Sequence, residues 1–526
     1  MAEATPFVFK VLSKPGVKLD GTQLEGDFYT ASLWCRMDRG RPRKMGGYRV
    51  ASDLMHGPSR GLLLFAQDSD VSTLHNGWAS GIEVVQVDET GLALTPPFDR
   101  TPIGFVADAN NLWIMDALYN VGATNTAIIA VAPPSAITIA NTTPGTIYFG
   151  DLNATTALVV LNPTDGPDET AGGLFCMAPY LVVYDIAGYV TWCAPNEPDN
   201  FATADGGGGA AGARVSATKI VCGIPLRGGP GNSPAALLWS LSSLIRMSFN
   251  GGETVFSFDT VSTDITVLSQ KAIIESDGTY LWPGTDRFYI FNGVVRELPN
   301  ELIRNWFFDN MNYQCHEKTF AFRNPRWGEI WFCFPFGNAT ECTHAAIYNY
   351  RYDCWYPTVL PNGGRSAATF SQILRYPMMM GALDTGLGAE RLWQHEFGVD
   401  EVISSGVVNA VRSYFTTADI ALPTGFGGAQ PVDLQISFSR VEPDFVLQGA
   451  LMVTLAARKY AMADEVELKT VNFDPAAFDP AEPQSYTVPF KKMGRINRLT
   501  FESNVVGGDY QLGDTVGVAQ PEQSRQ

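Results

Sequence analysis

The sequence predicts an all-β protein with a β-propeller-like body and a C-terminal β-sandwich or barrel-like domain. Its 526 residues are 45% apolar and 17% charged, and they include 51 Gly and 33 Pro, a mixture typical of short strands joined by tight turns. Short apolar and aromatic runs recur along most of the chain, separated by turn residues. After about residue 398 the runs alternate apolar with polar residues, which indicates a second kind of β domain.

Residues 1–50 are predicted to form an N-terminal arm with several turns and one strand-like run at 28–34. The arm holds a basic cluster that includes a single acid, Asp38, in a chain whose formal net charge is −18. The cluster consists of Arg36, Arg39, Arg41, Arg43, Lys44 and Arg49. It has two interpretations, a solvated β-turn or a docking surface for an acidic neighbouring subunit. We take these six residues as the candidate partner-binding site.

The clearest strand pattern lies between residues 269 and 355, where two antiparallel units follow one another. The first unit contains Asp277-Gly278 and Asn292-Gly293, which are hairpin turns that tolerate positive φ, and aromatic and β-branched residues flank both. The second unit repeats the pattern around a turn at Gly337-Asn338. Four-stranded units repeated in this way build a propeller.

Residues 51–398 are predicted to be the propeller-like body. Strands ending in Asp or Asn recur at loose multiples of about 55 residues, as at Tyr184-Asp185, Phe291-Asn292 and Tyr348-Asn349. The pattern predicts six or seven blade-like units, with an irregular β-rich domain as the alternative. A stretch rich in Ala, Thr and Pro allows an inserted small domain at 123–178.

Residues 399–526 are predicted to form the C-terminal β domain. Four runs alternate with period two, as expected of strands that bury one face. These runs are 407–415, 434–440, 451–455 and 498–502. A compact sandwich or barrel-like domain buries such faces against one another.

Five potential metal ligands lie within thirty residues of one another: Cys315, His316, Cys333, Cys342 and His344. Zinc sites usually show closely paired ligands such as Cys-x2-Cys, and only Cys342 and His344 are close here. Buried thiols and a polar loop histidine explain these residues better. The sequence therefore predicts no metal and no other cofactor.

No enzyme motif stands out in the chain. A phosphate-binding loop and a Gly-x-Ser-x-Gly elbow are both missing from the sequence. Asp286, Glu297 and Glu329 are carboxylates of the kind that glycosidases pair as acid and nucleophile, but a chain with 54 acids contains such pairs by chance. The sequence predicts a protein that is not an enzyme.

The charge and the ends of the chain bear on partners and location. A net charge of −18 disfavours a nucleic-acid-binding surface, because affinity for DNA depends on Lys and Arg at the phosphates. The same charge suits a passage that DNA must traverse without sticking. The start of the sequence does not match a signal peptide and no run of 18 apolar residues occurs, so we expect folding in the cytoplasm with reduced cysteines and no membrane segment.

Several aromatic and sulfur-containing residues have two interpretations. Trp306-Phe307-Phe308, Trp327, Met311 and the run 378–380 are candidate anchors for a protein partner. Residues of these types lie more often in the core.

Four runs of the sequence resemble the tail hub, or nozzle, proteins of short-tailed bacteriophages. The first extends from Asp20-Gly21-Thr22 through the basic segment 36–49, and the second covers 270–299. The third covers 324–357 with its Trp-Gly-Glu-Ile-Trp core, and the fourth covers 491–499. None of the four is a catalytic motif, and residues 123–260 match little in the group.

The resemblance implies a structural role. Such hubs, also called packaged-DNA stabilisation proteins, are propeller-containing subunits that form a sixfold ring beneath the portal and adaptor rings. They retain the packaged genome and conduct it at ejection. The implied partners are other copies of the chain, adaptor or portal-side ring proteins, and tail fibre, spike or needle proteins. DNA passes through without sequence-specific binding. The implied location is the tail of the virion, assembled in the host cytoplasm.

Two alternatives stay open at this point. A host-glycan-binding tail protein on a propeller scaffold requires exposed aromatic platforms, and a glycan hydrolase requires two carboxylates in one pocket. Particle mass separates these cases, since a ring of six favours the hub and a monomer or trimer favours receptor binding.

Overall fold

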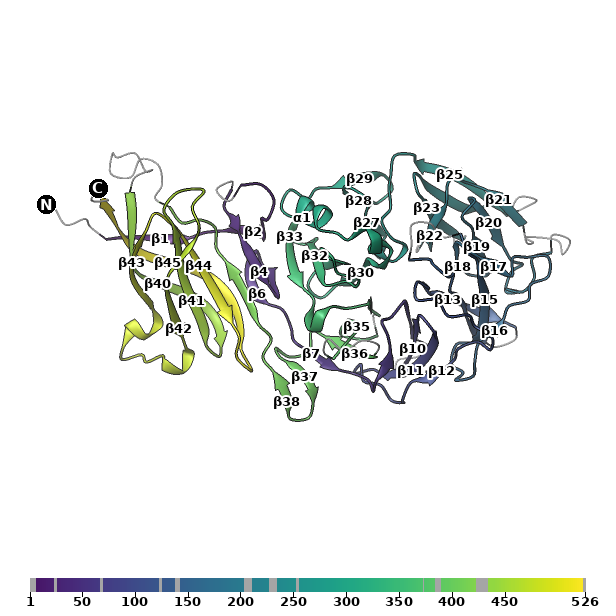
Figure 1. Cartoon of the computed structure of the whole chain (residues 1–526), viewed down its shortest axis with the longest axis horizontal. Helices are drawn as coiled ribbons and strands as arrows, with labels where there is room; N and C mark the ends of the chain where they lie inside the picture. Colours follow the sequence, from purple (N-terminus) through teal and green to yellow (C-terminus); the bar gives the residue numbers. More distant parts are fainter. Residues whose placement is uncertain are drawn as a thin grey trace.

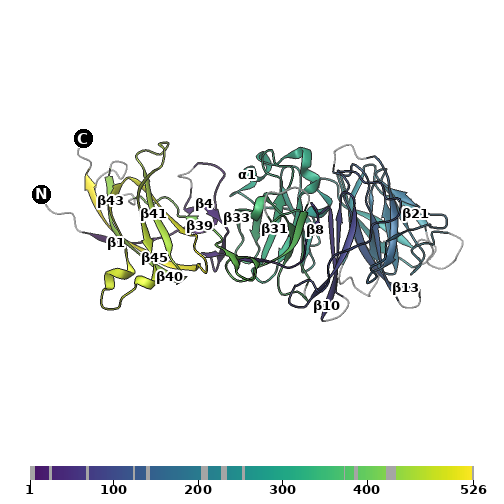
Figure 2. The same ribbon diagram turned by 60° about the horizontal axis from the view of Figure 1, so that its bottom comes forward.

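The computed structural model describes residues 6–22, 26–66, 70–122, 125–137, 142–202, 211–226, 234–251, 255–371, 373–383, 389–421 and 434–523. Strands dominate these residues, and the one α-helix among them is the short α1 (Arg304–Asp309). The predicted all-β fold is therefore confirmed. The molecule is elongated, with a ring of sheets at one end and a sandwich at the other, where both chain termini lie (Figures 1 and 2).

The ring body begins with two sheets from the first third of the chain. The first contains, from its inner strand outward, β9 (Gly61–Ala66), β10 (Val71–Trp78), β11 (Gly81–Asp88) and β12 (Phe98–Asp99). The second contains β13 (Ile114–Val121), β14 (Asn125–Val131), β15 (Gly145–Asp151) and β16 (Val159–Val160), with β17 (Glu169–Thr170) also paired to β15. Residues in which the sequence allowed an inserted domain thus supply strands of the second sheet.

The third and fourth sheets continue in the same order along the chain. The third contains β18 (Gly173–Met177), β19 (Tyr180–Tyr184), β20 (Tyr189–Trp192) and β21 (Ala211–Arg214). The fourth contains β22 (Ile220–Pro225), β23 (Ala235–Ser240), β24 (Leu244–Phe249) and β25 (Phe256–Ser262). The polyglycine run 206–209 lies outside the described residues.

The fifth and sixth sheets are the two units that the sequence indicated most clearly. The fifth contains β26 (Ile274–Ser276), β27 (Thr279–Pro283), β28 (Phe288–Phe291) and β29 (Val295–Leu298). The sixth contains β30 (Phe320–Asn324), β31 (Glu329–Phe334), β32 (His344–Asn349) and β33 (Cys354–Val359). Asp277 and Gly278 both have positive φ between β26 and β27, so the predicted Asp-Gly turn is confirmed.

The seventh sheet closes the ring with a strand from the start of the chain. Its order is β34 (Ala367–Thr369), β35 (Met378–Gly381), β36 (Ala389–His395), β7 (Tyr48–Val50), β37 (Glu401–Ser404) and β38 (Val407–Asn409). Strand β8 (Met55–His56) also pairs with β36. Because β7 comes from residues far before β36, the two ends of the ring are joined by backbone hydrogen bonds rather than by side chains alone.

Apolar side chains pack between every pair of neighbouring ring sheets. Consecutive residues on a strand point to opposite faces, so in β27 Leu281 packs with the sixth sheet while Trp282 packs with the fourth. In β31, Phe332 faces the fifth sheet and Trp331 faces the seventh. A further cluster that includes Leu74 and Leu392 joins the first and seventh sheets. These strands are buried on both faces and read as continuous apolar runs for that reason.

The C-terminal body consists of two sheets, and both contain strands from the N-terminal segment. One has the order β43 (Val488–Gly494), β40 (Leu434–Gln448), β45 (Asp509–Gln523), β6 (Arg41–Lys44) and β5 (Cys35–Asp38), with β1 (Phe7–Val11) paired to β45. The other has the order β4 (Ala31–Leu33), β39 (Ser413–Thr416), β44 (Ile496–Ser503), β41 (Leu451–Arg458) and β42 (Val466–Phe473). A core that includes Phe438, Phe501 and Tyr510 lies between them.

The segment before residue 50 therefore belongs to both bodies. A parallel pair, β2 (Lys14–Val17) and β3 (Phe28–Tyr29), lies between the sandwich and the sixth ring sheet. Strands β1, β4, β5 and β6 complete the sandwich, and β7 completes the ring.

Candidate functional site

Arg36, the first residue of the predicted partner-binding cluster, is buried at the junction of the two bodies. Its Nε donates to Glu329 Oε1 at 2.9 Å, and its Nη1 donates to Glu396 Oε2 at 2.9 Å. The guanidinium lies over the Trp327 ring, 4.4 Å from its centroid. We call Arg36, Glu329 and Glu396 the junction cluster. It joins β5 of the sandwich to the sixth and seventh ring sheets.

The carboxylates of the junction cluster have further hydrogen bonds. Glu329 accepts from the Tyr356 hydroxyl at 2.8 Å, and Glu396 accepts from the Trp327 ring at 3.0 Å. Burial raises the pKa of Glu329 even though Arg36 favours its charge. Burial also opposes the charge of Glu396, but the contact with Arg36 is strong enough to hold the pKa of that carboxyl below its usual range. Arg36 therefore holds two buried acids at one point.

Four other members of the predicted cluster also contact the chain itself. Lys44 is buried and donates to the Gly508 carbonyl oxygen at 2.7 Å. Arg41 is within ion-pair distance of Asp514 in the sandwich. Arg43 contacts Asp38 at 3.2 Å, and Arg49 donates to Gln394 at 2.7 Å. Most of the basic cluster therefore attaches the N-terminal segment to the two bodies.

Arg39 differs from the other members of the cluster because its side chain is exposed. It has φ of 53° and lies in the turn between β5 and β6. Binding of a neighbouring subunit by the cluster stays a prediction. Arg39 is the member whose exposed side chain is accessible to such a subunit.

The cysteine and histidine residues considered as metal ligands have other surroundings in the structure. Cys333 and Cys342 are buried, and Cys342 Sγ donates to the carbonyl oxygens of Lys318 at 3.3 Å and Cys333 at 3.5 Å. Burial lowers the pKa of His344 to about 4, and its ring stacks on Phe336 at 4.1 Å. Within the described ranges, no group of three or more His, Cys, Asp or Glu side chains is placed to hold a metal ion.

The three carboxylates considered for glycoside hydrolysis do not share one pocket. Asp286 contacts Arg287 at 2.8 Å, and Glu297 lies 3.8 Å from the same guanidinium. Both acids are exposed on the surface of the fifth sheet unit. Glu329 belongs instead to the buried junction cluster. Its side chain has no exposed area, so it has no access to a substrate.

Most of the aromatic and methionine residues considered as partner anchors are in the core. The side chains of residues 378–380 have no exposed area, and Phe307, Phe308 and Met311 are buried in the cluster of the fifth and sixth sheets. Trp306 is partly buried and packs edge-on against Phe334.

A cavity of about 280 Å³ lies on the axis of the ring. Strands of six ring sheets line it through residues such as Leu62, Asp116, Leu174, Cys222, Phe320 and Ala367, and Lys271 comes from the turn before the fifth sheet. Lys271 donates to the Arg60 carbonyl oxygen, and burial together with the nearby Arg60 charge lowers the pKa of its amine to about 7. Asp116 accepts from the Cys176 backbone N–H at 2.8 Å. The sequence did not indicate this pair, because only the ring brings the two side chains to one cavity.

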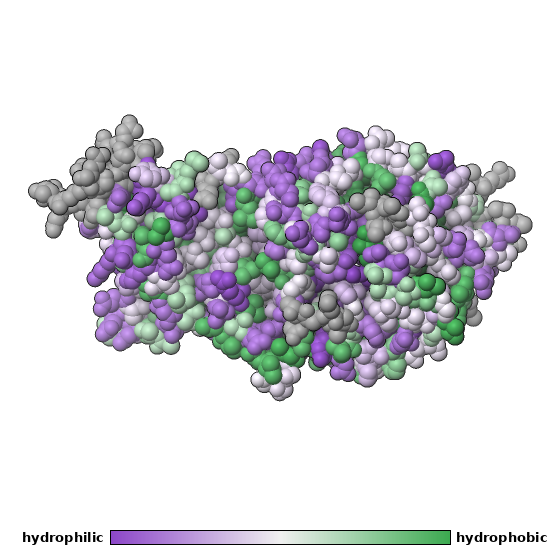
Figure 3. All heavy atoms as spheres, viewed as in Figure 1, coloured by the Kyte–Doolittle hydropathy of each residue, from purple (hydrophilic) through white to green (hydrophobic). Residues whose placement is uncertain are grey.

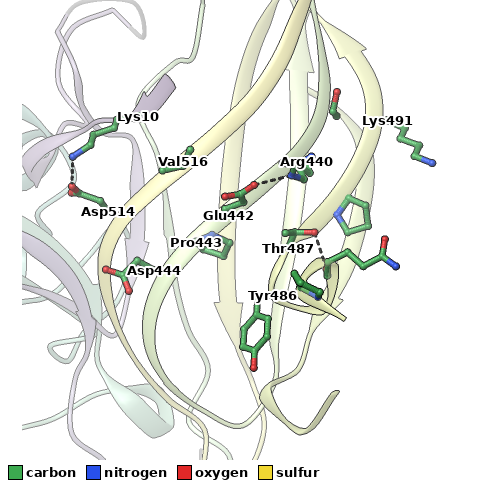
Figure 4. A pocket seen from close by; sticks show the side chains of 14 residues that line it. Lys10, Arg440, Glu442, Pro443, Asp444, Tyr486, Thr487, Lys491, Asp514 and Val516 are labelled. Atoms are coloured by element: carbon green, nitrogen blue, oxygen red, sulfur yellow. Dashed lines mark hydrogen bonds and ion pairs between the residues drawn. The ribbon is translucent and has the colours of Figure 1, made fainter. Parts of the chain in front are cut away.

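A wider groove of about 1190 Å³ crosses the outer side of the sandwich (Figure 4). Its walls carry both signs of charge, with Lys10 bonded to Asp514 at 2.7 Å and Arg440 bonded to Glu442 at 2.7 Å. Figure 4 shows Tyr486 and Asp444 along the same groove. The charged groups are largely paired with one another, so the groove has no strong preference for anions or cations.

In the part of the chain that the structure describes, no helix has the length and apolar character of a membrane-spanning segment. Comparison with known proteins gave no matching family model and no curated protein similar to the chain.

Proposed function

We propose that this chain is a structural subunit of a bacteriophage short tail, a hub or nozzle that retains packaged DNA and forms part of the conduit for its ejection. In this proposal the ring of seven sheets is a seven-bladed β-propeller, and six copies of the chain surround the DNA path. The proposal places the protein in the virion tail, after assembly in the host cytoplasm.

The observation that carries the proposal is the junction cluster. Arg36 comes from the first run that resembles the hub proteins, and Glu329 and Tyr356 come from the third. These runs are far apart in the sequence, yet their polar side chains meet in one buried network. Two runs that resemble the hub proteins thus supply the residues that join the two bodies. This supports a shared architecture rather than a shared reaction.

The distribution of charge also supports a conduit. The chain carries a net charge of −18, and its described basic side chains in the 36–49 segment mostly contact this same chain. An acidic wall repels phosphates at short range, and this repulsion is screened beyond about 8 Å at physiological salt. Such a wall lets DNA move past without binding.

The experiment is to assemble particles of the phage that encodes the chain with and without this protein. We expect heads that lack it to lose their DNA or to expose it to nuclease, and supply of the protein in trans restores nuclease resistance. DNA-filled particles that fail only in adsorption would overturn the proposal in favour of a host-glycan-binding protein. Release of reducing sugar from host polysaccharide by the purified protein would favour a hydrolase.

A further inference from the structure

The hairpin β37–β38 extends the seventh sheet beyond its closing strand. Strand β37 pairs in parallel with β7, and β38 pairs with β37, but the outer edge of β38 has no partner among the described strands. The hairpin projects from the junction of the two bodies (Figure 1). All residues from Ser404 to Asn409 are exposed. The backbone groups along this edge are therefore free to pair with another strand.

The surface of the hairpin is uncharged, and its outer strand exposes two valines. The ten residues 402–411 contain no ionisable side chain, and Val407 and Val408 are 46% and 39% exposed. The acid at the base of the hairpin, Glu401, is turned inward, where Asn362 and Asn409 each donate to it at 2.8 Å. The projecting edge consequently presents no charge to solvent.

Apolar residues of the sandwich continue this surface. The turn after β44 exposes Val505 and Val506, which are 36% and 60% accessible. It is fixed beside the hairpin because Gly507 N–H donates to Asp400 at 2.7 Å, one residue before β37. Figure 3 shows hydrophobic residues gathered at the base of the projection. We call Val407, Val408, Val505 and Val506 the junction patch.

Most other outer strands of the ring carry a charged residue or a proline, whereas the two-residue outer strand of the second sheet, β16, carries neither. The last strands of the first, third, fourth and fifth sheets each carry a charged residue, namely Asp99, Arg214, Asp259 and Arg296. In the sandwich, β42 carries Glu467 and Lys469, and β43 carries Pro489. Charged residues and proline on edge strands prevent unwanted association. The edge of β38 lacks both devices.

We propose that the free edge of β38 and the junction patch bind a second copy of this chain, as the contact between neighbouring subunits of a ring. Charge is compatible with this occupant, since two copies that each carry −18 repel one another least when they meet through uncharged surface. A basic partner protein would find no acidic side chain on the β38 edge or the junction patch with which to form an ion pair. The inference rests on the proposed function, because a hub is a ring of identical subunits. In such a ring, one surface of each copy contacts a different surface of the next.

The test compares two valine-to-lysine variants that change the net charge equally. Val408→Lys places a charge on the β38 edge, and Val466→Lys places one on the exposed edge strand β42, where Val466 is 58% accessible. Native mass spectrometry and analytical ultracentrifugation measure the assembly, and circular dichroism confirms that both variants are folded. We expect the wild-type protein and Val466→Lys to form the same multimer, and Val408→Lys to be a folded monomer.

A multimer that persists in Val408→Lys overturns the inference and leaves the proposed function standing. A wild-type protein that stays monomeric over the accessible concentrations also overturns it, as does a loss of assembly in both variants. A third outcome separates the two proposals. If assembly depends on Val408 but particles without the protein still protect their DNA, the contact is supported and the proposed function is overturned. The particle experiment therefore tests the proposed function, and the mass measurement tests the subunit contact.

Discussion

A group of buried charged side chains lies at the contact between the two bodies. The Arg36 side chain is 1% exposed and touches two carboxylates, Glu329 and Glu396. Replacing a buried ion pair with apolar groups is often neutral, whereas removing one partner leaves an uncompensated charge and costs about 3–5 kcal/mol. The cluster is thus a place where a single substitution has a large effect.

Arg36→Met is expected to lower the free energy of unfolding by about 3–5 kcal/mol, because two carboxylates lose their common cation. Urea unfolding followed by tryptophan fluorescence measures the change. Arg39→Met is the matched control, since Arg39 lies in the same segment and is exposed. Equal midpoints for the two variants would contradict the role of the junction cluster.

Glu390 gives the fold a pH dependence with a defined sign. It is 7% exposed, at the seam between the first and seventh ring sheets, where it accepts from Ser366 Oγ at 2.6 Å and from the Ser59 backbone N–H at 3.3 Å. Burial and the neighbouring Glu341 raise its pKa to about 7, although Arg60 acts in the opposite direction. A carboxyl whose pKa is raised on folding binds its proton more tightly in the folded state. Its contribution to stability is therefore lost as pH rises from about 4.5 to about 7.

Glu390→Gln is expected to be more stable than the wild-type protein at pH 8, by at most about 3 kcal/mol, since each pKa unit corresponds to about 1.4 kcal/mol. The advantage shrinks as pH falls below about 7, where the wild-type carboxyl takes up its proton. Unfolding midpoints of both proteins across this range measure the difference. A difference that is constant with pH would show that Glu390 does not titrate on unfolding.

Among the elements, the closing strand β7 begins at a backbone contact that leaves no room for a side chain. The chain enters it through Gly47, where an added Cβ would lie 2.1 Å from the Asp400 carbonyl oxygen. The Tyr48 N–H donates to this same oxygen at 3.0 Å. The backbones of β7 and of the segment leading to β37 therefore approach too closely for any side chain.

Gly47→Ala is expected to destabilise the protein by about 1–3 kcal/mol, the usual cost of overpacking a close contact. The effect arises because the Asp400 backbone must move, which weakens the pairing of β7 with β37. Thermal unfolding followed by circular dichroism measures it. A variant with the wild-type midpoint would mean that β7 has more room than the structure shows.

The turn signals of the fifth sheet were sufficient to place its strands. Asp277-Gly278 sits between two runs of residues that match the observed register, because positive φ in a two-residue turn fixes which residues face each other. Strand β7 gave no comparable signal. Its partners β36 and β37 lie more than 300 residues away, and local sequence carries no information about such pairing.

For the whole molecule, the N-terminal segment makes the two bodies interdependent. Its strands complete the sandwich and then the ring, and Arg36 lies between them. A fragment of residues 51–398 lacks β7 and leaves the edge of β36 unpaired. A fragment of residues 45–411 retains β7 together with the hairpin β37–β38.

We expect the 45–411 fragment to be soluble and to unfold cooperatively, and the 51–398 fragment to aggregate or to melt at a lower temperature. Both fragments lack Arg36, so the comparison tests the closing strand β7 together with the hairpin β37–β38 that pairs with it. Size-exclusion chromatography and circular dichroism melting measure the two properties. Indistinguishable fragments would show that the ring closes without β7.

The sequence by itself determined the all-β class, the repeating units around residues 269–355 and the texture of the C-terminal domain, because turn residues and strand alternation act over a few residues. Only the tertiary structure decided what the basic segment 36–49 contacts, where residues 125–160 belong and which strand closes the ring. These outcomes depend on pairing between residues hundreds of positions apart. A charge looks the same in the sequence whether it faces solvent or a buried carboxylate, and burial alone separates the two.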